Sequence, residues 1–204
     1  MKTRLDMEEQ MFKPEILEKV KEAGFVVFDD GDYNLNLIAV RNLENHPNQF
    51  DDKLYVCYKV HGLWREHIFQ ITTDPGKRYL ENPNYRDGGG VAIAAHPQQA
   101  RSAYKIDLHR GKYKALVQRG PGNVQYWRDK NFDNRADYGG EIYDNKIGLN
   151  IHRSSAKGSS LVGPHSAGCI VFSDAEEFGV FMRVCQLQVS KRNFKTFTLT
   201  ILAE

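Results

Sequence analysis

The chain has 204 residues, of which 41% are apolar and 26% are charged, and its 28 basic and 26 acidic side chains give a formal net charge of +2. These proportions predict one globular domain, residues 1–204, able to bury a core. Both signs of charge are interspersed, without the basic stripe of nucleic-acid-binding proteins. No apolar run reaches the ~20 residues that span a bilayer, and the polar start does not resemble a signal peptide. We therefore expect no nucleic-acid partner, no membrane span, and a location in the cytoplasm or inside an assembled particle.

The first half of the chain predicts one helix followed by strands. After Pro14, four apolar residues recur at helical spacing, namely Ile16, Leu17, Val20 and Ala23. Gly24 is a natural stop for this helix. Residues 1–24 are therefore expected to form a helical extension packed on the body. Strand-like runs follow at residues 25–28, 35–40, 54–60, 63–72 and 91–95. His61-Gly62 predicts a hairpin, and turn residues, including Asp87 and Gly88, precede the last run.

The second half predicts further strands and one long helix. Residues 96–105 look like a polar connection, and strands are expected at residues 106–109, 113–118, 124–128 and 194–202. Ser173 and Glu176 have capping-box spacing. Apolar residues then recur at helical intervals, namely Phe178, Phe181, Met182, Cys185 and Val189. The whole pattern indicates a β-rich α+β fold.

Three cysteines at wide spacing argue against a disulfide framework. Cys57 lies in a strand-like run and Cys185 on the apolar face of the long helix, where free cysteine packs as a small hydrophobe. Cys169 differs, because it follows a glycine at the junction of a loop with a strand. It is the candidate nucleophile.

The segment from Ile147 to Ser173 brings a histidine and this cysteine to the ends of two predicted strands. A cysteine nucleophile needs a base, since its unperturbed pKa of about 8.5 leaves the thiol mostly protonated. His152 ends the first run, and we expect it to face Cys169 across neighbouring strands. Gly168 lets the backbone turn sharply before the nucleophile, where backbone N–H groups would bind an oxyanion. Ser166 either donates to that site or bonds the backbone of its own turn.

This arrangement resembles the L,D-transpeptidase (YkuD-like) family. There a histidine precedes a Ser-His-Gly-Cys motif by a similar interval, and the matching residues here are His152 and Ser166-Ala167-Gly168-Cys169. The resemblance implies a mixed sheet or sandwich with a helix after the cysteine strand. It also implies a thioester formed by Cys169 on a peptidoglycan stem peptide, with His152 as base and loop-shaping roles for Ser166 and Gly168. Further stretches, namely Thr72–Gly76, Tyr113–Gln118, Arg128–Asp129 and Asn150–Ser154, resemble uncharacterised phage and bacterial proteins with this scaffold, which implies a virion-associated assembly.

Two positions depart from the family motif. Ala167 replaces its histidine, and Arg153 replaces the small residue after the catalytic histidine. Arg153 and His165 are candidate substrate-binding residues, since a guanidinium attracts a substrate carboxylate. His109 and Asp107 would also position substrate if they share the cleft.

Three other interpretations stay open. The fold could serve as a non-catalytic structural or cell-wall-binding module of a virus particle, because a fold alone does not establish activity. Asp129, Asn131 and Asp133 space their oxygens as a calcium loop begins, but Asn134 and Gly140 break that pattern, and the same residues favour a plain Asx-rich turn without any ion. A zinc site would group three central residues with one further histidine, namely His152, His165 and Cys169 with His96 or His109.

Overall fold

The computed structural model describes residues 13–44, 46–85 and 89–204. In this part of the chain, residues in strands outnumber residues in helices. A closed barrel contains β1 (Asn36–Arg41), β2 (Asp52–Val60), β3 (Leu63–Thr72), β5 (Gln98–His109), β6 (Tyr113–Val117), β9 (Ile151–Arg153), β10 (Ile170–Phe172) and β11 (Phe197–Ala203). A smaller sheet contains β4 (Val91–Ala94), β7 (Gln125–Asp129) and β8 (Tyr143–Asp144). The helices are α2 (Ile16–Glu22), α3 (Lys77–Leu80) and α4 (Ala175–Arg192).

The barrel runs in the order β1-β11-β5-β6-β9-β10-β3-β2 and closes between β2 and β1. Two pairs, β1 with β11 and β9 with β10, are parallel, and the other pairs in the barrel are antiparallel. The predicted β-rich α+β class is thus confirmed. The sheet has mixed pairing, as expected, but it closes on itself, which leaves no edge strand exposed.

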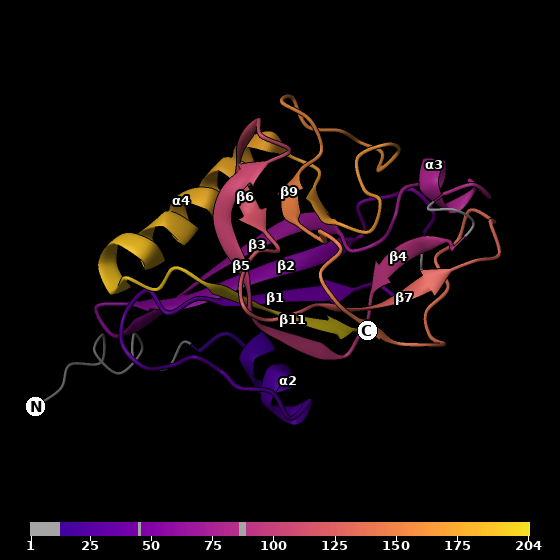
Figure 1. The fold of residues 1–204 in the computed structure, drawn as a ribbon. Helices are drawn as coiled ribbons and strands as arrows, with labels where there is room; N and C mark the ends of the chain where they lie inside the picture. Colours follow the sequence, from indigo (N-terminus) through magenta and orange to yellow (C-terminus); the bar gives the residue numbers. More distant parts are fainter. Residues whose placement is uncertain (1–12, 45, 86–88) are drawn as a thin grey trace, which may run out of the picture.

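The predicted long helix forms, with one correction at its cap, and the predicted N-terminal extension contains α2, whereas residues 1–12 of that extension lie outside the described residues. Leu17 and Val20 of α2 pack on the outside of the barrel, whereas Phe181 and Cys185 of α4 join the main core. Figure 1 shows α4 and α2 on opposite sides of the strands. The cap of α4 is Asp174, whose carboxylate accepts the backbone N–H groups of the second and third helical residues. Ser173 lies one residue too early to cap and donates to Gln70 O instead.

Two strand predictions were wrong. Residues 25–28 are not in a strand, because the side chain of Asn36 bonds both the N–H and the C=O of Phe28. The supposed polar connection at 96–105 is mostly strand β5, which starts at Gln98. The polar side chains of this segment suggested an exposed connection. Gln98, however, is buried, and its Nε2 donates to the backbone carbonyls of Ala95 and Gln125.

The predicted hairpin at His61-Gly62 is confirmed. Both residues have positive φ, 52° and 78°, as a tight turn between β2 and β3 requires. The carboxylate of Asp32 accepts both of their N–H groups. Asp87 and Gly88 lie outside the described residues.

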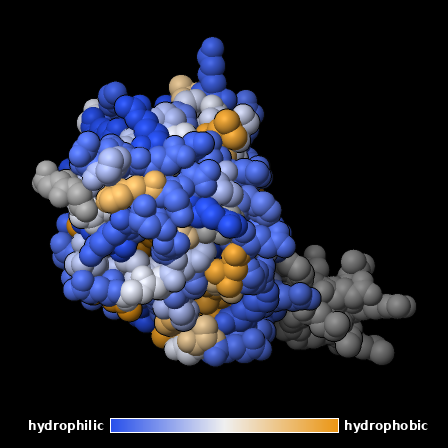
Figure 2. Space-filling view, turned by 90° about the vertical axis from the view of Figure 1, so that its right-hand side faces the viewer, coloured by the Kyte–Doolittle hydropathy of each residue, from blue (hydrophilic) through white to orange (hydrophobic). Residues whose placement is uncertain are grey.

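Figure 2 shows a largely hydrophilic face with apolar side chains in small separate patches. Within the described ranges, no helix has the length and apolar character needed to cross a membrane.

Candidate functional site

His152 lies in β9, and Cys169 directly precedes β10, the strand that pairs with β9 in parallel. Ile170 pairs with Ile151, and Val171 pairs with His152. Cys169 immediately precedes the first paired residue of β10, so it lies diagonal to His152 rather than directly opposite. The expectation of neighbouring strands is confirmed, whereas direct opposition is replaced by this offset of two residues.

The loop before Cys169 requires glycine and is tied to its own backbone. Gly168 has φ +107°, and a Cβ there would lie 2.3 Å from the carbonyl oxygen of Ala92 in β4. Ser166 is fully buried; its Oγ donates to Cys169 O at 2.8 Å and accepts from Gly168 N at 3.2 Å. Ser166 therefore holds the turn, and the Gly168 N–H is already engaged rather than free for an oxyanion.

Cys169 differs from the other two cysteines in its surroundings. Its side chain is partly exposed, whereas Cys57 and Cys185 are fully buried, and burial raises the pKa of both buried thiols. The Cys169 Sγ lies 3.4 Å from the N–H of Asn150, which donates to it, and 3.5 Å from Gly148 O. The accessible thiol is thus the one that the sequence singled out.

His152 is oriented for a base. Its Nδ1 lies 2.8 Å from Arg153 O, and because a carbonyl only accepts, Nδ1 carries the proton. Nε2 is then the basic nitrogen, and it is buried without a hydrogen-bond partner in the described structure. Burial lowers the pKa of His152 to about 3, helped by the charges of His109, Arg110 and His165. The ring is therefore neutral at physiological pH.

His109 belongs to this site. Its ring stacks on His152 with centroids 4.1 Å apart and an interplanar angle of 25°. The Nδ2 of Asn150 lies 3.3 Å from Nδ1 of His109, and Asn150 Oδ1 accepts the N–H of Gln118. Burial lowers the pKa of His109 as well. Stacking of two neutral rings fixes the plane of His152.

Three residues of the site were not predicted from the sequence. Gln118 accepts the N–H groups of Gly148 and Leu149 through Oε1, and its buried Nε2 has no partner in the described structure. Tyr104 is fully buried with an unpartnered hydroxyl, and burial and the nearby charge of Cys169 raise its pKa. Tyr113 donates to Arg153 O at 3.2 Å. Only the polar character of these strand residues could have marked them.

The other predicted substrate-binding residues have different surroundings. Arg153 lies over the Tyr113 ring, 4.5 Å from its centroid, and His165 is close enough for its charge to affect His152. Asp107 is partly exposed and pairs with Arg119. His109, two residues further along β5, is buried against His152.

The two metal hypotheses find little support in the geometry. Among the described residues, no three His, Cys, Asp or Glu side chains gather as metal ligands would. Asp133 accepts the backbone N–H of Arg135, and Asn131 points its amide nitrogen, a donor, at Asp133 and Asp137. This is an Asx-rich turn. His96 lies elsewhere, in contact with Arg41, Trp127 and Tyr138.

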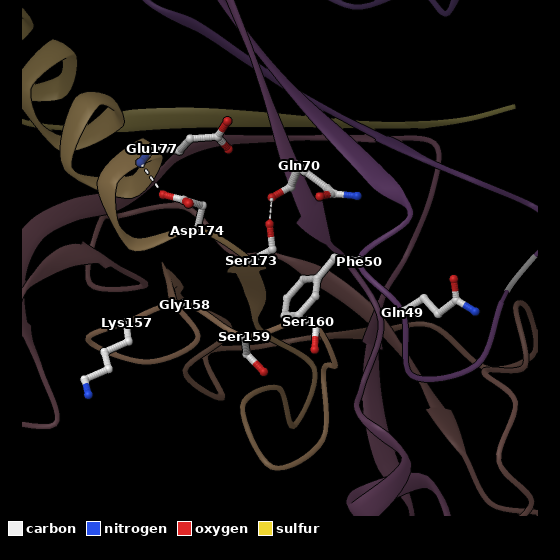
Figure 3. A pocket seen from close by; sticks show the side chains of 10 residues that line it. All are labelled: Gln49, Phe50, Gln70, Lys157, Gly158, Ser159, Ser160, Ser173, Asp174 and Glu177. Atoms are coloured by element: carbon white, nitrogen blue, oxygen red, sulfur yellow. Dashed lines mark hydrogen bonds between the residues drawn. The ribbon is translucent and has the colours of Figure 1, made fainter.

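A polar groove of about 710 Å³ lies at the other end of β10 (Figure 3). It is lined by amide, hydroxyl and charged side chains around Phe50, namely Gln49, Gln70, Lys157, Ser159, Ser160, Ser173, Asp174 and Glu177. Phe50 also packs with Val162 and Val171, and Cys169 packs against the same cluster. Cys169 does not line the groove, but Phe50 in the groove wall and Cys169 belong to the same apolar cluster.

Comparisons with protein-family models, with curated proteins and with solved structures find no match for this chain.

Proposed function

We propose that the protein is a cysteine acyl-transfer enzyme that acts on peptidoglycan stem peptides through a thioester at Cys169. The observation that supports the proposal is a partly exposed thiol directly before β10, next to a strand, β9, that carries a histidine whose Nε2 has no partner in the described structure. The substrate class rests on the resemblance of His152 and Ser166–Cys169 to L,D-transpeptidases.

The chemistry needs one proton shuttle. As Sγ of Cys169 bonds to the substrate carbonyl carbon, its proton passes to Nε2 of His152. The imidazolium returns that proton to the departing amine when the carbon–nitrogen bond breaks. Attack on the thioester by water gives hydrolysis, and attack by a second amine gives transpeptidation; either releases the thiol.

The low pKa of His152 keeps its imidazole neutral in the resting enzyme. A preformed thiolate–imidazolium pair would need a histidine that stays protonated near neutral pH, and burial opposes that here. Base catalysis at the moment of attack is therefore the favoured role. Alkylation of Cys169 should consequently show no inflection near the ordinary histidine pKa of about 6.5.

The test compares muropeptide digests made by wild type, Cys169→Ala and His152→Leu. We expect Cys169→Ala to give no products and His152→Leu to lower the rate by about 10²–10⁴-fold. Mass spectrometry of the products distinguishes added water from an added amine. Tyr126→Phe, on β7 of the smaller sheet, is the matched control and should leave the rate unchanged.

A digest identical for wild type and Cys169→Ala would contradict the proposal. If wild type also binds intact cell walls in that case, the non-catalytic wall-binding interpretation gains. Thiol labelling gives a second check, since Cys169 should be alkylated much faster than the buried Cys57 and Cys185.

A further inference from the structure

Beside the nucleophile loop lies a buried cluster centred on Arg41, which we call the Arg41 cluster: Arg41, Asp52, Thr73 and Asp74. Arg41 is fully buried at the end of β1, and Asp52 and Thr73 are 1% exposed or less. An arginine with no exposed surface is rare unless all its donors are paired. Its place next to the candidate site calls for an explanation.

Thr73 bridges the charges of the cluster. Its Oγ1 accepts from Arg41 Nε at 2.8 Å and donates to Asp52 Oδ2 at 2.7 Å. Asp52 Oδ2 also accepts the Thr73 N–H at 2.6 Å, and Arg41 Nη2 donates to Thr73 O at 3.1 Å. Asp74 lies 3.2 Å from Arg41 Nε. Arg41 and Asp52 therefore both bond the backbone of Thr73, and Arg41 also forms an ion pair with Asp74.

The turn that follows is bonded to the loop that carries Cys169. The N–H of Gly76 donates to Ser166 O at 2.9 Å, and a Cβ at Gly76 would lie 1.9 Å from Gly163 O. Ser166 in turn bonds Gly168 N and Cys169 O. A continuous chain of contacts therefore runs from Arg41 through residues 73–76 to the nucleophile.

The same arginine also fixes the opposite wall of the loop. Arg41 Nη1 donates to Ala94 O at 2.8 Å at the end of β4. Two residues earlier in β4, Ala92 O packs directly against Gly168. The loop before Cys169 is therefore held between two backbone segments, both bonded to one guanidinium.

We propose that the Arg41 cluster positions the nucleophile: it fixes residues 73–76 and β4 so that the loop 163–168 presents Cys169 to His152. The members are positioning residues, since they act on Cys169 through residues 73–76 and β4. This inference rests on the proposed function for its catalytic consequence, whereas the mechanical coupling of cluster and loop does not.

The sharpest test is the isosteric change Thr73→Val, which removes the bridging hydroxyl and keeps the side-chain shape. Thr73→Ser retains the hydroxyl and is the conservative rescue. Gln188→Leu, which breaks buried hydrogen bonds to Leu35 and Thr196 away from the loop, is the control for general loss of stability. Gly76→Ala, which forces residues 76 and 163 apart without changing charge, is a second probe.

Two measurements are made on all four variants. In hydrogen exchange, peptides covering residues 163–169 should exchange about tenfold faster in Thr73→Val and Gly76→Ala than in Gln188→Leu, once the rates are corrected for differences in unfolding free energy between the variants. The same peptides in Thr73→Ser should exchange at nearly the wild-type rate. On muropeptides, kcat should fall about tenfold with KM unchanged in the same two variants.

The outcomes separate this inference from the proposed function. If wild type releases no products but residues 163–169 still exchange faster in Thr73→Val and Gly76→Ala, the enzyme proposal fails and the positioning inference stands. If exchange of residues 163–169 in these variants matches that in Gln188→Leu, the positioning inference is overturned, whatever the activity of wild type.

Discussion

Two buried polar regions lie on either side of the loop that carries Cys169, and they differ in how their hydrogen bonds are used. In the Arg41 cluster, Arg41 makes bonds through Nε, Nη1 and Nη2, and Asp52 accepts through both oxygens. Asp74 Oδ1 has no hydrogen-bond partner in the described structure, but it forms an ion pair with Arg41 Nε at 3.2 Å. Around Cys169, three buried atoms have no partner in the described structure, namely His152 Nε2, Gln118 Nε2 and Tyr104 Oη.

This difference indicates different purposes. Buried polar groups are almost always paired, because an unpaired one costs roughly 1–3 kcal/mol. A region that uses its donors and acceptors internally is rigid and supports its neighbours. A region with several unused atoms beside a reactive thiol retains capacity to bond a substrate, which agrees with the proposed function.

The largest expected effect tests the internally bonded region. Arg41→Met leaves Asp52 and Asp74 buried without their cation and should lower the unfolding free energy by about 3–5 kcal/mol. Urea denaturation measures the loss. Arg119→Met removes an exposed ion pair with Asp107 and should cost less than about 1 kcal/mol. Equal losses in the two variants would show that the Arg41 cluster contributes no special stability.

A pH experiment tests whether His152 is buried in its neutral form. The pKa of folded His152 is about 3, below the unfolded value of 6.5, so between these values the unfolded chain binds a proton that the folded chain does not. Stability should therefore fall as pH drops below about 6.5, by roughly 2–3 kcal/mol between pH 7 and 4.5 at about 1.4 kcal/mol per pKa unit.

Comparison with His152→Leu isolates this contribution. Burial and the Asp74 carboxylate raise the pKa of Asp52 to about 7, which acts in the opposite direction, and burial lowers the pKa of His96 to about 4. Both effects are present in both proteins and cancel in the difference. Parallel stability curves for wild type and His152→Leu between pH 4.5 and 7 would refute the buried, neutral histidine.

The smallest expected effect concerns Tyr104. Tyr104→Phe removes a buried hydroxyl with no partner in the described structure, so stability should stay level or rise by up to about 1 kcal/mol. Thermal unfolding measures this. A clear loss of stability would mean that the hydroxyl is bonded after all and that the contrast between the two regions is weaker than we infer.

Local patterns in the sequence were sufficient for several features. Cys169 after Gly168, the hairpin at His61-Gly62 and the long helix after residue 173 each depend on neighbouring residues, whose turn chemistry and apolar spacing are visible in the chain. The difference between Cys169 and the two buried cysteines was also predictable, because strand and helix periodicity already indicated burial for Cys57 and Cys185.

Closure of the barrel, the diagonal offset of His152 and Cys169, and the Arg41 cluster were decided only by tertiary structure. Arg41 reads in sequence as the polar end of a strand, and nothing local pairs it with Asp52 and Thr73. Likewise Gln98 and Tyr104 look like residues of a polar connection, yet they are buried in β5. Their partners come from distant segments, and the energy that buries a polar side chain depends on those partners rather than on its neighbours in sequence.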